Sequence, residues 1–360
     1  MKDIEYKNII HNTIVPEMLS TEEQEGKYAT LVKFLGRNIP EHLYRFRKCD
    51  ENSISAFDKD QIWFSPPAEM NDDFDALMFF NKQNIHSSLE QFFNKFSDFV
   101  LKDKSIDEFP DSVRNTMSSE VLSIIKAQLE KMSSGDTVGL INQIHDFMIQ
   151  QIETGLPLVK HIIQNKLKIA CFSEVINSAA MWGYYGDYGK GFALAYDFRN
   201  YMYTDCAICN NRMLCPSSQN ANLYPIIYDD TPFNATEYAR YLLQQQMLQT
   251  IVPNEELYDR VRGAILCPDL FMSTKVLLHK STSWKHEYEW RLVYDCRNNT
   301  MLSEKFVYVK KKPSAIYLGR KISSTYEKLL RYIAAEKNMP VYKMTMDEDE
   351  SAYSLVPKLI

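Results

Sequence analysis

The spacing of apolar and polar residues changes several times along the chain, and each change predicts a different element. After a Ser-Thr cap, STEEQEGKYATLVKFLG at 20–36 places apolar residues at helical spacing, so residues 1–42 are expected to form a helical lead-in. Aromatic and arginine residues then alternate in LYRFR at 43–47, which is the pattern of a strand. Strands predicted on similar grounds are 61–65, 167–173, 191–197, 223–229, 289–295, 305–310, 315–319 and 341–346.

Two long stretches with apolar residues at helical period interrupt these strands. They cover about residues 85–168 and 232–280, and SSGD at 133–136 and TGLP at 154–157 are expected to separate helices within the first. Because strands bracket these insertions rather than alternating regularly with helices, we expect an α+β fold with a mixed, mainly antiparallel sheet in a single domain over 43–360. Shorter helices are predicted at 51–60, 178–188 and 323–337.

Composition places the chain among ordinary globular proteins. Its 360 residues are 45% hydrophobic and 24% charged, which is enough apolar chain to bury a core without metal or disulfide staples. Apolar runs are far shorter than the roughly 20 residues of a membrane-spanning helix, so no membrane association is expected. The N-terminus lacks a basic-then-apolar signal pattern, so we expect a cytoplasmic protein. A net charge of −6 disfavours broad coating of nucleic acid but leaves a local basic groove open.

Seven scattered cysteines fit reduced thiols better than a disulfide framework. Cys206 and Cys209, with Cys215 nearby, have the spacing of metal ligands. A zinc ribbon needs a second ligand pair, which the sequence does not offer, so we expect no metal.

A first polar cluster lies on the strand predicted at 43–47. The two-residue period of a strand places Arg45 and Arg47 on one face and Tyr44 and Phe46 on the other. Paired guanidinium groups suit a phosphate or a carboxylate. The alternative is a strand face with solvated arginines.

A second cluster follows the next predicted strand, in SPPAEMNDDFD at 65–75. Asn71, Asp72, Asp73 and Asp75 crowd this loop and are able to ligate a hard cation or orient a substrate. The same residue types also cap turns and helices, which we favour for any one of these carboxylates.

A third cluster is aromatic, in AAMWGYYGDYGKGFALAYD at 179–197. Trp182, Tyr184 and Tyr185 precede a glycine-containing turn and are able to form a stacking wall for a planar ring, or simply a core. The glycines lack the GxGxxG spacing, and the chain has no P-loop.

The fourth cluster is STSWKHEYEWRLVYD at 281–295. If EYEWR enters a strand, Glu287, Glu289 and Arg291 share one face, where Arg291 and Lys285 would hold a carboxylate ionised. An ion-pair ladder on the sheet surface is the alternative.

Taken together, these segments resemble a bacterial family called domain of unknown function 2971. The resemblance spans about residues 43–345 and departs from the family pattern at Asp73, where the family has proline. The segments that carry it, in order, are LYRFR, IWFSPPAEMNDDFD, IACFSE, MWGYYGDYGKGFALAYD, WKHEYEWRL and SAIYLG.

The layout of these segments is in turn similar to that of an ADP-ribosyltransferase. This second resemblance implies that NAD is a substrate, with Arg45 or Arg47 on its phosphates. It also implies that Tyr184 or Tyr185 stacks on nicotinamide. The catalytic carboxylate is Glu289 or Glu287, which would bond the ribose and stabilise the cation. The expected cofactor-binding residues are Tyr44, Arg45, Arg47, Ser65, Asn71, Asp75, Trp182, Tyr184, Tyr185 and Arg291.

Three functions therefore remain open. The leading hypothesis is an enzyme that cleaves NAD and transfers ADP-ribose to a macromolecular acceptor, either protein or nucleic acid. The resemblance makes it a candidate toxin or phage-defence effector with a neutralising or regulatory protein partner. The alternatives are a metal-dependent nuclease using Asp72, Asp75, Glu287 and Glu289, and a non-catalytic binding or regulatory module.

Overall fold

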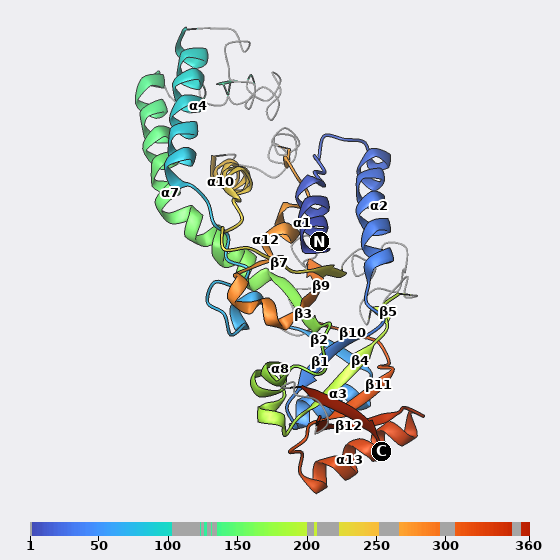
Figure 1. Cartoon of the computed structure of the whole chain (residues 1–360). Coiled ribbons are helices and arrows are strands. Elements are labelled where there is room, and N and C mark those ends of the chain that lie inside the picture. Colours follow the sequence, from blue (N-terminus) through green and yellow to red (C-terminus); the bar gives the residue numbers. More distant parts are fainter. Residues whose placement is uncertain are drawn as a thin grey trace.

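The computed structural model describes residues 2–102, 123, 126–127, 131, 135–199, 205–206, 223–251, 266–295, 307–347 and 354–360. Figure 1 shows a β-sheet in the middle of the molecule, with a group of long helices at one end and helix α13 with the C-terminus at the other.

The N-terminal segment is helical, as predicted. It forms α1 (Lys2–Asn12) and α2 (Thr21–Asn38). The Ser20 hydroxyl accepts the Glu23 amide, and the Glu23 carboxylate accepts the Ser20 amide at 2.9 Å. This reciprocal pair satisfies two amides that the first turn leaves open, so α2 begins at Thr21.

The main sheet confirms the predicted α+β class with a mainly antiparallel arrangement. Its eight strands lie in the order β13-β12-β11-β4-β1-β3-β9-β6, and only β11 and β12 are parallel neighbours within this sheet. The strands are β1 (Leu43–Arg47), β3 (Leu167–Ser173), β4 (Phe192–Tyr196), β6 (Leu223–Pro225), β9 (Glu289–Asp295), β11 (Ala315–Leu318), β12 (Val341–Met346) and β13 (Leu355–Leu359).

This sheet opens between β1 and β3. All five residues of β1 pair with β4, and all seven residues of β3 pair with β9. In contrast, β1 and β3 share only the register position Tyr44–Ser173. Beyond that position the two strands separate, which leaves the Arg45–Arg47 segment facing a gap rather than a neighbouring strand.

Two smaller sheets complete the strand structure. One contains β2 (Gln61–Phe64), β10 (Val307–Lys310) and β5 (Asp205–Cys206), and the other pairs β7 (Ile227–Tyr228) with β8 (His279–Lys280) in parallel. Ser65 and Ile169 exchange backbone hydrogen bonds of 2.9 and 2.8 Å, which ties the end of β2 to β3.

Short helices cover the β4 half of the main sheet. Helix α8 (Ala179–Tyr184) packs Met181 and Trp182 against Phe46 and Tyr317, on the strand face opposite Arg45. Helices α3 (Glu51–Asp58) and α13 (Ser324–Glu336) contribute buried residues such as Phe57 and Leu330 to the large core. The predicted alternation of β1 is confirmed, because Phe46 is buried in this cluster and the partly buried Tyr44 packs against it.

The two predicted insertions supply the long helices. Helices α4 (Lys82–Lys102), α7 (Thr137–Lys166) and α10 (Thr236–Ile251) pack on one another at the end of the molecule away from α13 (Figure 1). Asp136 caps α7, which confirms the break predicted at 133–136.

The break predicted at 154–157 is wrong, because α7 continues through Pro157. Buried Ile152, Leu156, Val159 and Ile163 keep helical spacing across this stretch, and their burial outweighs the hydrogen bond that proline removes.

The helical prediction for 232–280 is only partly correct beyond the end of α10. Residues 252–265 lie outside the described part of the chain, and within 266–280 the structure has a single helix, α12 (Met272–Val276), followed by β8. The edge strand β13 was not predicted, because LVPKL is short and contains a proline. None of the helices that the structure describes is both long enough and apolar enough to span a membrane.

Candidate functional site

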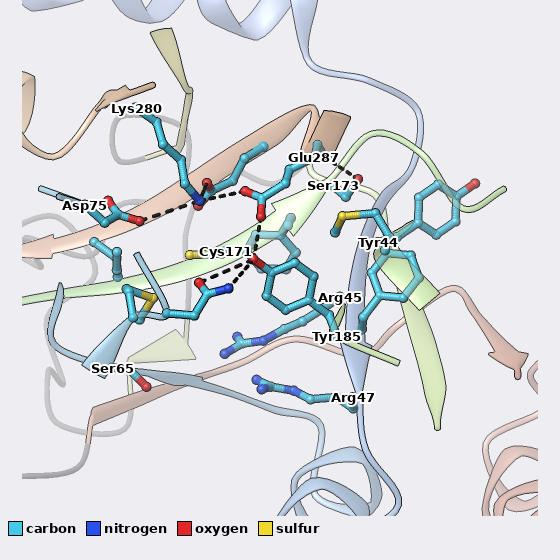
Figure 2. A pocket seen from close by; sticks show the side chains of 17 residues that line it. Tyr44, Arg45, Arg47, Ser65, Asp75, Cys171, Ser173, Tyr185, Lys280 and Glu287 are labelled. Atoms are coloured by element: carbon cyan, nitrogen blue, oxygen red, sulfur yellow. Dashed lines mark hydrogen bonds and ion pairs between the residues drawn. The ribbon is translucent and has the colours of Figure 1, made fainter. Parts of the chain in front are cut away.

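A cavity of about 190 Å³ lies where the main sheet opens. Its walls come from β1, β3, the segment 65–75, α8, β8 and the residues around the start of β9 (Figure 2). Each of the four clusters recognised in the sequence therefore contributes residues to the wall of this one cavity, although the clusters are distant along the chain.

One end of the cavity is formed by two arginines. Arg45 and Arg47 project from β1 into the gap beside β3, as their shared strand face predicts (Figure 2). Arg45 is only 7% exposed, donates one hydrogen bond to the carbonyl of Trp63, and lies 5.6 Å from the ring centroid of Phe172. Its Nη1 atom is buried without a hydrogen-bond partner among the described residues.

Neither guanidinium at this end has a carboxylate partner within the part of the chain that the structure describes. Burial, together with the charge of Arg47, lowers the pKa of Arg45 to about 9, and burial also lowers the pKa of Arg47. A buried cation without a partner is unfavourable, so this end of the cavity is complementary to an anion.

The opposite end is a buried ion cluster built on Arg291. Its two terminal nitrogens donate hydrogen bonds of 2.7 Å to the two oxygens of Asp75, and its Nε donates one of 2.7 Å to Glu289. With a further hydrogen bond to the carbonyl of Leu277 and a second one to Glu289, every donor of the guanidinium has a partner. Arg291 is fully buried. Its two hydrogen bonds to Asp75 hold the loop that carries Asp75 against β9.

Lys280 joins the carboxylates of this cluster. Its Nζ lies 2.6 Å from Glu287, 3.2 Å from Glu289 and 3.7 Å from Asp75. Lys285, the cation expected from the sequence at this place, is instead exposed and pairs with Asp3. The second cation of the cluster is therefore Lys280, which lies on the two-residue strand β8.

Glu287 reaches the cavity by a different route from the one predicted. The strand begins at Glu289, and Glu287 is the last residue of a 3-10 helix, η4 (Thr282–Glu287). The Tyr288 backbone is left-handed, with φ 45°, and turns the chain between them. The shared strand face proposed for the two glutamates is thus wrong, although both side chains line the cavity.

The two glutamates differ in the direction of their pKa shifts. Burial would raise the pKa of Glu289, but the charges of Arg291 and Lys280 outweigh it and hold this pKa at about 2. Burial and the charge of Glu289 raise the pKa of Glu287, against the opposing effect of Lys280. Glu289 is therefore held as the anion, and of the two carboxyls Glu287 is the one with the raised pKa.

Tyr185 covers Glu287 from the α8 side. Its hydroxyl donates to Glu287, and the amide nitrogen of Asn71 donates to the same hydroxyl at 3.0 Å. Ser173 donates its hydroxyl to the Glu287 carbonyl at 2.6 Å. Glu287 is thus held at its side chain by Tyr185 and Lys280 and at its backbone by Ser173.

Comparison with known proteins identifies the region that contains most of the carboxylate end. Residues 181–292 match the family described as protein of unknown function (DUF2971). This match confirms the family resemblance over the part of the chain that contains the segments MWGYYGDYGKGFALAYD and WKHEYEWRL. It includes Tyr185, Lys280, Glu287, Glu289 and Arg291, and lies C-terminal to the β1 arginines. No curated protein and no solved structure matches the chain.

Within the DUF2971 match, the aromatic residues expected to bind a cofactor lie in three different environments. Tyr185 lines the cavity. Trp182 is core, because it is 2% exposed and donates its indole N–H to the carbonyl of Ile176. Tyr184 is 68% exposed and lies outside the cavity wall.

The remaining expected residues are divided between the cavity and its surroundings. Tyr44, Ser65, Asn71 and Asp75 line the cavity, whereas Arg291 lies behind it. Asp72 accepts the Phe74 amide at 3.0 Å, which is the turn-capping role favoured from the sequence. Of the cysteines with metal-ligand spacing, Cys206 lies on β5, and Cys209 and Cys215 fall outside the described residues.

The sequence analysis missed Lys280 and Cys171. Cys171 lies in the middle of β3, lines the cavity and hydrogen-bonds Glu289; burial and the charge of Glu289 raise the pKa of its thiol well above the usual value. Alternation along β3 places Cys171 on one face with Ile169 and Ser173, all three of which line the cavity. That period was a usable signal for Cys171, whereas the two-residue strand β8 offers none for Lys280.

Proposed function

We propose that this cavity is the active site of an enzyme that cleaves the glycosidic bond of NAD and transfers ADP-ribose to a macromolecular acceptor. The observation that carries the proposal is the pair of arginines without carboxylate partners, among the described residues, facing a carboxylate cluster across one cavity. Such a bipolar cavity suits a substrate with an anionic group at one end and a developing positive charge at the other.

The arginine end supplies the phosphate site of the proposal. Arg45 and Arg47 offer guanidinium donors on one strand face, and Arg45 retains an unused donor nitrogen. Guanidinium binds phosphate oxygens in a fixed bidentate geometry. Burial strengthens the attraction, because little water competes inside the cavity.

The carboxylate end supplies the negative charge. Three carboxylates, Asp75, Glu287 and Glu289, face the two cations Lys280 and Arg291. Asp75 and Glu289 each contact both cations, whereas Glu287 contacts Lys280 alone. The unbalanced charge is therefore closest to Glu287, so Glu287 rather than Glu289 is the leading catalytic carboxylate in this proposal.

The chemistry requires few other groups. As the bond between the ribose and nicotinamide breaks, nicotinamide leaves as a neutral molecule and positive charge develops on the ribose, as in glycoside hydrolysis. A carboxylate fixed beside that carbon stabilises the charge. With about 190 Å³ the cavity is smaller than most ligand sites, so it encloses the reacting part of a dinucleotide and leaves the remainder outside.

The arrangement does not favour the nuclease alternative. Two-metal hydrolysis needs carboxylate oxygens that are free to bind cations. Here Lys280 and Arg291 occupy the oxygens of Asp75, Glu287 and Glu289, and Asp72 caps a turn.

The test is the loss of NAD in the presence of purified protein, with and without cell extract as an acceptor source. Glu287→Gln is expected to lower the rate by about 100-fold or more, the scale of removing one charge-stabilising group. Glu336→Gln, on the exposed end of α13, is the matched control and should cleave NAD like the wild type. A chelator should have no effect.

Two results would count against the proposal. NAD that stays intact under all conditions would remove its basis. A Glu287→Gln protein that loses thermal stability while NAD turnover by the wild type is undetectable would favour the binding-module alternative.

A further inference from the structure

The rim of the cavity beside Glu287 carries a row of aromatic rings. Starting from Tyr185 in the cavity, the Tyr184 ring follows at 6.4 Å, His286 lies 6.1 Å from Tyr184, and Trp284 lies 6.1 Å from His286, as measured between ring centroids. We call Tyr184, His286 and Trp284 the rim row. Its far end returns to the site, because the Trp284 ring lies 4.8 Å from Lys280 Nζ.

The rim row is not part of the hydrophobic core. Tyr184 is 68% exposed, although Trp182 on the same short helix is buried. His286 and Trp284 are partly exposed, and their rings are nearly parallel, with an interplanar angle of 28°. The Tyr184 ring is therefore the most open planar face of the row, and an open aromatic face next to a cavity favours a planar ligand.

The order of groups in the proposed substrate indicates that the acceptor of ADP-ribose approaches on the side of the rim row. With the phosphates at Arg45 and Arg47 and the reacting ribose carbon at Glu287, the adenosine end continues from the arginine end. Figure 2 shows the guanidinium groups and Glu287 on opposite sides of the cavity. The rim row lies at the Glu287 end, where the acceptor must approach the ribose carbon.

We propose that the rim row binds the bases of a single-stranded nucleic acid and so presents a nucleobase as the acceptor of ADP-ribose. This inference rests on the proposed function. The exposed Tyr184 ring offers a stacking face to a base, and base–aromatic stacking tolerates every base. In the transfer step, the bond from the ribose carbon to nicotinamide breaks and nicotinamide keeps the electron pair. A new bond forms from the lone pair of an exocyclic amino nitrogen, and the amino proton passes to Glu287.

The rim row contains no lysine or arginine. Contacts made by aromatic rings release few counterions, so stacking rather than phosphate contacts must supply the affinity of the rim row. Binding through the rim row should therefore depend only weakly on salt concentration.

Binding is tested without NAD, using fluorescently labelled 12-nucleotide single strands of mixed sequence, one of DNA and one of RNA. Either strand should bind more tightly than the matching duplex, and Tyr184→Ala should weaken binding about ten-fold. Tyr184→Trp, which keeps a planar ring, should restore it. Tyr332→Ala is the matched control, since Tyr332 is a similarly exposed tyrosine on α13. Equal affinity of wild type and Tyr184→Ala, a steep salt dependence or no binding at all would overturn the inference.

Transfer is tested separately with NAD labelled in its adenylate phosphate. The label should enter the nucleic acid of a cell extract and become soluble after nuclease, not protease, treatment. A label found only in protein overturns the inference but leaves the proposed function intact. If NAD remains uncleaved, the proposed function fails, and the binding experiment still decides whether the rim row holds nucleic acid.

Discussion

The two ends of the cavity differ in how their buried charges are satisfied. At the carboxylate end, Arg291 is fully buried and all its donors are used by Asp75, Glu289 and a backbone carbonyl. At the arginine end, Arg45 is almost equally buried but keeps an unused donor and has no carboxylate partner among the described residues. Two buried arginines thus differ: Arg291 has a hydrogen-bond partner for every donor, whereas Arg45 does not among the described residues.

This difference indicates which buried charges stabilise the fold and which are available to a ligand. A buried ion pair with every hydrogen bond made needs no further partner, and removing one member leaves the other uncompensated. A buried cation without a partner weakens the fold until an anion binds. The carboxylate end therefore holds the loop 70–75 and β8 in place, whereas the arginine end is the part of the cavity that a ligand completes.

The largest expected effect is on the free energy of unfolding when Arg291, and for comparison Arg45, is replaced by methionine. Arg291→Met should lower the free energy of unfolding by about 3–5 kcal/mol, because Asp75 and Glu289 stay buried without their main partner. Arg45→Met should lower it by no more than about 1 kcal/mol, the value of its bond to the Trp63 carbonyl, since it also removes an unpaired charge. Urea unfolding measures both, and equal losses would contradict the comparison.

The second effect is a pH dependence confined to the carboxylate end. Since the pKa of Glu289 lies at about 2 in the folded protein and near 4.5 otherwise, its stabilisation of about 3 kcal/mol is present above pH 4.5 and is lost as the pH falls toward 2. The stability difference between wild type and Glu289→Gln should shrink over this range. The difference for Arg45→Met should stay flat. Parallel curves for Glu289→Gln would show that Glu289 is not held ionised.

A smaller effect should appear at the arginine end when an anion is added. Pyrophosphate at ten times its dissociation constant stabilises a folded protein by about 1.4 kcal/mol. We expect this rise in the unfolding temperature for the wild type and its loss in Arg45→Met and Arg47→Met. Lys328→Met removes an exposed cation on α13 and controls for net charge. A rise that survives in both arginine variants would place the anion elsewhere.

The sequence predicted those parts of the site that lie on regular strands. Alternation in LYRFR placed Arg45 and Arg47 on one face, and β1 and β3 have the predicted bounds. Gly191, in the segment MWGYYGDYGKGFALAYD, also has a structural reason, since a Cβ there would lie 2.1 Å from the carbonyl oxygen of Arg47. For these two strands the local pattern was sufficient, whereas the local signal for a break at 154–157 was overridden by packing along α7.

Elsewhere the decisive contacts are distant in the sequence or irregular. Arg291 and Asp75 are 216 positions apart, and no local pattern pairs them. Glu287 depends on the left-handed backbone of Tyr288, a conformation that the sequence does not announce in a residue other than glycine. The ADP-ribosyltransferase resemblance remains a proposal, because the family match carries no activity.

The smallest effect concerns the raised pKa of Glu287, which distinguishes this carboxyl from Glu289. The Tyr185 hydroxyl donates to Glu287 and thereby lowers the pKa of that carboxyl, against the raising effect of burial. Tyr185→Phe should therefore raise the pKa of Glu287 further, so that NAD cleavage on the acid side of its pH profile is lost at a higher pH than in the wild type. Folding stability should change by only about 1 kcal/mol. An acid limb that does not move would mean that the ionisation of Glu287 does not control the rate.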